Sequence, residues 1–77
     1  MKVVVRLFGP LAEAASTSSL EVVVEHPTVG AVVEAVGKAG LKIDPSVRFA
    51  LNTDYATSDA AVRAGDVVSL IPPVGGG

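Results

Sequence analysis

The residues of this sequence that could do chemistry lie at its end, where two prolines and a valine are followed by three glycines. Each proline locks φ at about −65° and lacks an N–H, so the pair sets the direction in which the chain leaves the preceding apolar run. Glycines carry no Cβ and can enter a channel that any side chain would block. The reactive group of this tail is the α-carboxylate of Gly77. The alternative is an inert, frayed terminus.

Composition limits the class of protein. The 77 residues suffice for one domain, and an apolar fraction of 49% with 18% charged residues predicts a compact fold rather than disorder. The absence of cysteine excludes disulfides, thiolate metal sites, cysteine-ligated iron–sulfur clusters and a cysteine nucleophile. A net charge of −2 with scattered Lys and Arg argues against nucleic acid as a partner. No apolar run approaches the roughly 20 residues of a membrane span, and the charged N-terminal run is not a signal peptide, so we expect no membrane partner and a cytoplasmic location.

Hydrophobic periodicity predicts the elements that must position the tail. Alternating patterns predict strands over residues 2–8, 20–25, 47–51 and 67–71, with a short strand beginning at Tyr55. A short helical turn is expected over residues 11–15. The main helix is expected to begin at Thr28 as N-cap and to end at Gly40. One face of that helix is a stripe made of Val29, Val32, Val33 and Val36.

The order of these elements predicts an α+β fold. Strands surrounding a single main helix are typical of a mixed sheet with the helix packed on one face, and the simplest such arrangement is the β-grasp, or ubiquitin-like, fold. In it the first and last strands lie side by side and parallel at the centre. We therefore expect a β-grasp domain over residues 1–74 and a flexible glycine tail over residues 75–77, projecting from one end of the sheet.

An ordered set of short matches makes the chain resemble the MoaD/ThiS family of ubiquitin-like sulfur carriers, most of all the small subunit of molybdopterin synthase. The matching segments are VVRLFGPL at 4–11, TVG at 28–30, LN at 51–52 with Tyr55, GDVV at 65–68, and PPV at 72–74. Two positions depart from the family pattern. Gly75 stands where the family usually has a varied small residue, and the turn at 52–54 lacks a glycine.

The resemblance implies a carrier cycle in which this chain itself is not an enzyme, has no catalytic residue and binds no cofactor. An E1-like, MoeB-like adenylyltransferase would use ATP to convert the Gly77 carboxylate to an acyl-adenylate. A sulfur donor would displace AMP and leave a thiocarboxylate. A MoaE-like large subunit, expected to form a heterotetramer with this chain, would then pass the sulfur to the molybdopterin precursor in molybdenum cofactor biosynthesis.

The resemblance implies that the tail threads into a partner's active site, and its residues are Pro72, Pro73, Val74, Gly75 and Gly76. It also implies an apolar patch for partner binding, formed by Phe8, Val62 and Ile71. Strand phasing independently places Phe8 and Ile71 on the sheet face away from the helix. The alternative for each is packing at the sheet edge. Tyr55 is expected to pack in the core or at a sheet edge rather than to act in catalysis. The aspartates at the turns have no metal-ligand spacing and are expected to make local hydrogen bonds, and they are Asp44, Asp54, Asp59 and Asp66.

Two other functions remain open at this point. The same carrier chemistry could serve tRNA thiolation or thiamine synthesis, with conjugation to protein lysines as a further use. Alternatively, the chain could be a β-grasp binding module with an inert tail, in which case removing Gly76 and Gly77 would change nothing.

Overall fold

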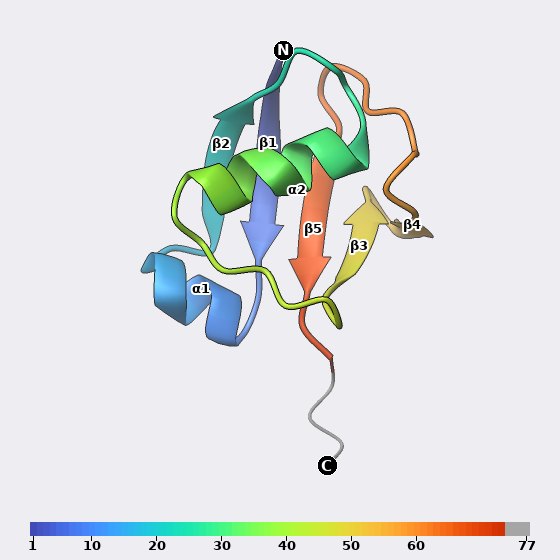
Figure 1. The fold of residues 1–77 in the computed structure, drawn as a ribbon. Helices are drawn as coiled ribbons and strands as arrows, with labels where there is room; N and C mark the ends of the chain where they lie inside the picture. Colours follow the sequence, from blue (N-terminus) through green and yellow to red (C-terminus); the bar gives the residue numbers. More distant parts are fainter. Residues whose placement is uncertain (74–77) are drawn as a thin grey trace.

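A mixed five-stranded sheet with one helix lying across it organises the computed structural model, which describes residues 1–73 (Figure 1). The elements are β1 (Lys2–Leu7), α1 (Pro10–Ala15), β2 (Ser19–Val23), α2 (Val29–Lys38), β3 (Arg48–Leu51), β4 (Asp54–Ala56) and β5 (Val67–Ile71). Across the sheet the strand order is β2-β1-β5-β3-β4. The predictions for Val74, Gly75, Gly76 and Gly77 concern residues outside the described part of the chain.

The first and last strands form the centre of the sheet. β1 and β5 run parallel, with Val5 opposite Val68 and Leu7 opposite Leu70. β2 joins the free side of β1 and β3 joins the free side of β5, both antiparallel, and β4 closes the far edge against β3. The predicted β-grasp fold is therefore confirmed, including the parallel central pair.

The core lies between α2 and the sheet face that meets it, which we call the inner face. Side chains on this face are buried from both central strands, as the period-two alternation predicts. From the helix, Val29, Val32 and Val36 are fully buried, and Val33 is partly buried. Valine is a weak helix former, so this helix depends on packing its stripe against the sheet, where each buried side chain contributes roughly 1.5–3 kcal/mol.

Both ends of α2 are closed as the sequence predicts. The Thr28 hydroxyl accepts a hydrogen bond from the Ala31 N–H at 3.2 Å, which makes Thr28 the N-cap. At the other end Gly40 has a φ of +105°, its N–H donates to the Gly37 carbonyl, and the Leu41 N–H donates to the Val36 carbonyl. This is a Schellman termination with glycine in the left-handed position. Within residues 1–73 no helix has the length and apolar character needed to cross a membrane.

The segment between β4 and β5 is fastened to the N-terminus of α2. The Gly30 N–H donates to the Ser58 carbonyl at 2.8 Å, and the Val62 N–H donates to the Pro27 carbonyl at 2.7 Å. These bonds draw Val62 into the core, where it is 2% exposed. The prediction that Val62 belongs to an exposed partner-binding patch is wrong, because this segment covers the end of the helix and turns its one large apolar residue inward.

The contact at Gly30 yields a stability prediction. A Cβ at position 30 would lie 3.0 Å from the Ser58 carbonyl oxygen, so Gly30→Ala requires the backbone at Ser58, in the loop that buries Val62, to move by a few tenths of an ångström. We expect a loss of about 1–2 kcal/mol in the free energy of unfolding, as is typical of overpacking. The matched control is Gly37→Ala, where nothing lies within 4 Å and the higher helix propensity of alanine should stabilise the fold by about 0.5 kcal/mol. Urea unfolding of both variants checks this, and equal stabilisation by the two substitutions would contradict it.

Candidate functional site

The root of the tail lies beside the end of β1. Because β1 and β5 are parallel, the segments that follow them leave the sheet at the same end, away from the N-terminus (Figure 1). Gly9 there has a φ of +55° and a ψ of −131°, a conformation open to glycine and strained for other residues. A Cβ at Gly9 would lie 3.4 Å from Cγ of Pro72. That separation is an ordinary van der Waals distance, so the positive φ rather than crowding favours glycine here, and Pro72 lies close to the chain that follows β1.

A hollow of about 520 Å³ occupies the sheet face opposite α2, which we call the outer face. Its floor consists of Ala50 and Ser69, which are cross-strand partners on β3 and β5. Both are less than 10% exposed although they lie on the uncovered face, because larger side chains surround them. Those surrounding residues, together with the start of the tail, include Phe8, Tyr55, Ile71, Pro72 and Pro73. The tail thus begins at the rim of an apolar depression.

Of the three residues predicted as a patch, the structure brings two together. Phe8 is 41% exposed and Ile71 is partly buried, and both line the hollow on the outer face. Val62 lies in the core on the other side of the sheet. Their placement agrees with the strand phasing, and partner binding by them remains a prediction.

Tyr55 is the residue of this hollow whose position the sequence reasoning missed. Of the two expected placements, the core is wrong, since Tyr55 is 71% exposed, and it lies instead on the edge strand β4. Tyr55 is the register partner of Ala50, so it stands on the outer face beside the floor of the hollow. The alternation along residues 54–56 carried the signal, but three residues are too few to fix the phase of a strand without its neighbour.

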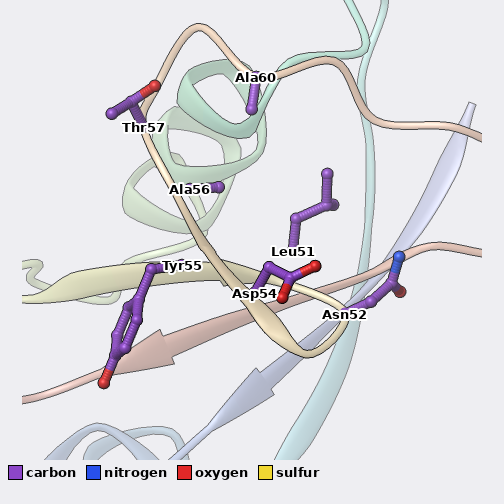
Figure 2. A pocket seen from close by; sticks show the side chains of 7 residues that line it. All are labelled: Leu51, Asn52, Asp54, Tyr55, Ala56, Thr57 and Ala60. Atoms are coloured by element: carbon purple, nitrogen blue, oxygen red, sulfur yellow. The ribbon is translucent and has the colours of Figure 1, made fainter.

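A second hollow, of about 580 Å³, lies around the edge strand β4 (Figure 2). Asp54 and Thr57 contribute oxygen atoms to it, and Leu51, Ala56 and Ala60 contribute apolar surface. Figure 2 shows the Tyr55 side chain pointing away from these apolar groups. Asp54 is the one carboxylate in this lining and no histidine accompanies it, so the arrangement provides no acid–base pair.

The turn that lacks the family glycine is held by a hydrogen-bond network. Asn52 has a φ of +57°, which asparagine tolerates better than most residues. Its side-chain amide accepts from the Val67 N–H at 3.0 Å and donates to Asp66 Oδ1 at 3.1 Å. Asp66 Oδ2 in turn accepts from the Arg63 N–H at 2.8 Å. Asparagine therefore replaces glycine here by linking the β3–β4 turn to the start of β5.

Local hydrogen bonds account for the aspartates whose pKa values are shifted. The Arg63 N–H and then the Asn52 amide lower the pKa of Asp66. The hydroxyl and N–H of Ser46 lower the pKa of Asp44, and the hydroxyl of Thr57 lowers the pKa of Asp59. Each of these three carboxylates is thus used in a turn. Within residues 1–73 no group of three or more His, Asp or Glu side chains could hold a metal ion.

The network around Asp66 predicts a pH dependence of stability. A carboxylate whose pKa is lower in the folded state than its unfolded value of about 3.9 stabilises the fold above that value, and the contribution is lost as pH falls through the folded pKa. We expect Asp66→Asn to lower stability at pH 7 and to reduce the further loss between about pH 5 and pH 3.

Urea unfolding at several pH values measures this effect. Glu25→Gln is the control, because Glu25 is exposed and its side chain forms neither a hydrogen bond nor an ion pair with the described residues. An unchanged pH profile in Asp66→Asn would contradict the role of the network.

Comparison with known proteins places the chain in a family. The family model described as the ThiS family matches residues 5–77. Among solved structures, SAMP1 from Haloferax volcanii is 28% identical with a TM-score of 0.85, and the match covers 100% of both chains. The complex of subunits 1 and 2 of molybdopterin-converting factor from Helicobacter pylori 26695 contains a chain that is 25% identical with a TM-score of 0.66, again over 100% of both chains.

A third structure supports the fold alone. Urm1 from Trypanosoma brucei is 20% identical with a TM-score of 0.71, and the match covers 99% of this chain and 95% of that one. The β-grasp sheet, the glycine-dependent root of the tail and the family match that runs through the terminal glycines agree with one another. This chain belongs to the ThiS family of ubiquitin-like sulfur carriers.

Proposed function

We propose that this chain carries sulfur as a thiocarboxylate on Gly77 and serves as the small subunit of molybdopterin synthase. The observation that carries the proposal is the parallel pairing of β1 and β5, which leads Pro72 and Pro73 away from the sheet beside the apolar hollow. The family match extends over the glycines that follow. The likeness to a chain of the molybdopterin-converting factor complex supports the choice of acceptor.

The first step activates the carboxylate. A Gly77 carboxylate oxygen attacks the α-phosphorus of ATP, the bond from that phosphorus to the bridging oxygen breaks, and pyrophosphate leaves. The product is a mixed anhydride, whose carbonyl is far more reactive than that of a carboxylate. An E1-like, MoeB-like adenylyltransferase supplies the ATP site. This chain contributes the glycine tail and its terminal carboxylate.

The later steps move the sulfur. A donor delivering hydrosulfide attacks the carbonyl carbon of the adenylate, AMP leaves with its bonding electrons, and the thiocarboxylate forms. Thiocarboxylate sulfur is a softer nucleophile than carboxylate oxygen, so it suits transfer to a pterin precursor in a MoaE-like large subunit. We propose a heterotetramer of two small and two large subunits for that step. The carrier needs no acid or base of its own in this scheme.

A second use of the same activated terminus is favoured by one comparison. The matching Haloferax volcanii protein is also described as a small archaeal modifier protein, and it resembles this chain at 27–28% identity. Attack on the adenylate by a lysine amine instead of sulfur would join the chain to another protein through an amide bond. Transfer of the sulfur to tRNA or to thiamine is the remaining alternative, and the partner decides among them.

Intact mass spectrometry tests the carrier proposal. We would incubate the protein with ATP, a sulfide source and MoeB-like adenylyltransferases from several sources, beside a variant lacking Gly77. The expected result is a mass gain equal to the replacement of one oxygen by sulfur, absent in the truncated variant. If no adenylate and no thiocarboxylate form with any of these enzymes, the chain is better explained as a binding module.

Phe8→Asp tests whether the outer face is used in activation. Phe8 is 41% exposed, so the substitution should leave the fold intact while placing a carboxylate at the rim of the hollow. We expect the KM for the carrier in adenylation to rise by roughly tenfold, as for loss of an aromatic anchor that becomes buried at an interface. Val23→Asp is the matched control, because Val23 is an exposed apolar residue at the other edge of the same face, on β2. Equal activation of Phe8→Asp and wild type would rule the patch out.

A further inference from the structure

The outer face carries cations although the protein as a whole is acidic. Cross-strand register places Lys2, Arg6 and Arg48 on this face, which are three of the six Lys and Arg residues. Of the eight Asp and Glu residues, Glu21 alone occupies an outer-face strand position, opposite Val4. The other carboxylates lie mainly on turns, loops and the helices, and they account for the net charge of −2. The uncovered face is therefore the positive side of the molecule.

The two arginines of this set are cross-strand partners of Ser69 and Ile71, which line the hollow at the end where the tail begins. Arg6 on β1 lies opposite Ser69, and Arg48 on β3 lies opposite Ile71, so the two stand on either side of β5. Both are exposed, and within residues 1–73 neither forms an ion pair. Lys2, by contrast, lies at the opposite end of β1.

Arg6 is held beside the hollow rather than left free to extend into water. Its guanidinium carbon lies 5.7 Å from the centroid of the Phe8 ring, within the range of a cation–π contact. Such a contact keeps a positive charge next to an aromatic side chain at the rim. The guanidinium N–H groups remain available, and their planar arrangement matches a carboxylate in bidentate geometry.

We propose that the outer face binds a protein segment in which one large apolar side chain fills the hollow and flanking Asp or Glu carboxylates pair with Arg6 and Arg48. The small residues of the floor, Ala50 and Ser69, provide the space, and the two arginines provide the charge. An apolar centre with a charged rim is the usual anatomy of a protein interface. The inference rests on the proposed carrier function for the identity of the partner. It adds that the partner's docking segment carries an apolar side chain flanked by carboxylates.

The same two cations could also meet phosphate groups of nucleic acid. The remainder of the molecule argues against this, because a net charge of −2 repels a polyanion beyond the local contact. The aromatic groups at the hollow stand on opposite sides of a floor made of small side chains, which suits a single inserted side chain. An oligonucleotide therefore enters the test as a competing ligand.

Titration followed by nitrogen-15 NMR tests the proposal with the full chain. The probe is the capped peptide Glu-Glu-Leu-Glu-Glu, compared with Glu-Glu-Ser-Glu-Glu, Lys-Lys-Leu-Lys-Lys and a short oligothymidylate. We expect saturable shifts of the Ala50, Ser69 and Ile71 amides with the first peptide, and roughly tenfold weaker binding of the others. The absence of these shifts, or equal binding of the serine peptide, the basic peptide or the oligothymidylate, overturns the proposal.

Charge variants assign the effect to the two arginines. The double variant Arg6→Asp and Arg48→Asp should bind the acidic leucine peptide roughly tenfold more weakly, and Lys2→Asp should bind it like wild type. Arg6→Gln with Arg48→Gln is a milder pair, should charge reversal disturb the fold. Wild-type affinity in the folded double variants overturns the proposal.

An enzymatic readout separates this inference from the carrier function. With an adenylyltransferase that modifies the wild type, the double variant should show a KM for the carrier raised roughly tenfold and an unchanged kcat at low salt. Normal thiocarboxylation with an unchanged KM rejects the inference and leaves the carrier function standing. Failure to modify the wild type rejects the carrier function, and the peptide titration still decides the inference.

Discussion

The parallel pairing of β1 with β5 is the constraint on which the rest of the structure depends. It joins the two ends of the described chain, places Val5 and Val68 side by side in the core, and brings the ends of both strands to one edge of the sheet. Without it the residues after Ile71 would have no fixed starting point. With it, Pro72 lies against Gly9, at a position where a side chain would be strained.

The two faces of the sheet differ in how they are covered. The inner face is closed by valines of α2 and by the segment that carries Val62, which the backbone hydrogen bonds to Gly30 and Pro27 hold in place. The outer face has no covering element among residues 1–73 and is hollow at its centre, because Ala50 and Ser69 are small. Apolar surface that monomers seldom leave exposed in one place therefore gathers next to the root of the tail.

In the proposed cycle the chain presents a group and its partners perform the chemistry. The aspartates with lowered pKa values are engaged in turns, where hydrogen bonds from Ser46, Thr57, Asn52 and Arg63 account for the shifts. Two of these carboxylates accept from a hydroxyl, and within residues 1–73 none of the three is hydrogen-bonded to a histidine that could act as a base. The properties that matter for a carrier are then a rigid fold, a surface that a partner can recognise and a tail that begins at a defined place.

The sequence alone determined the strands, the main helix and the class of fold. Period-two alternation in β1 and β5, the valine stripe of α2, the Thr28 cap and the Gly40 terminator all depend on neighbours a few residues away, and each was predicted correctly. The family resemblance was likewise readable from short ordered matches. Phe8 and Ile71 were assigned to the outer face for the same local reason.

Tertiary structure decided what depends on contacts between distant segments. Val62 is in the core because its loop bonds to the start of α2, and no local pattern reports such a contact. Tyr55 faces outward because β4 pairs with β3, which three residues of alternation cannot reveal. Asn52 serves where the family has glycine because Asp66 and Val67, far along the chain, hold its amide. The hollow exists only where Ala50 and Ser69 meet across two strands, so its shape is a property of the assembled sheet rather than of any one segment.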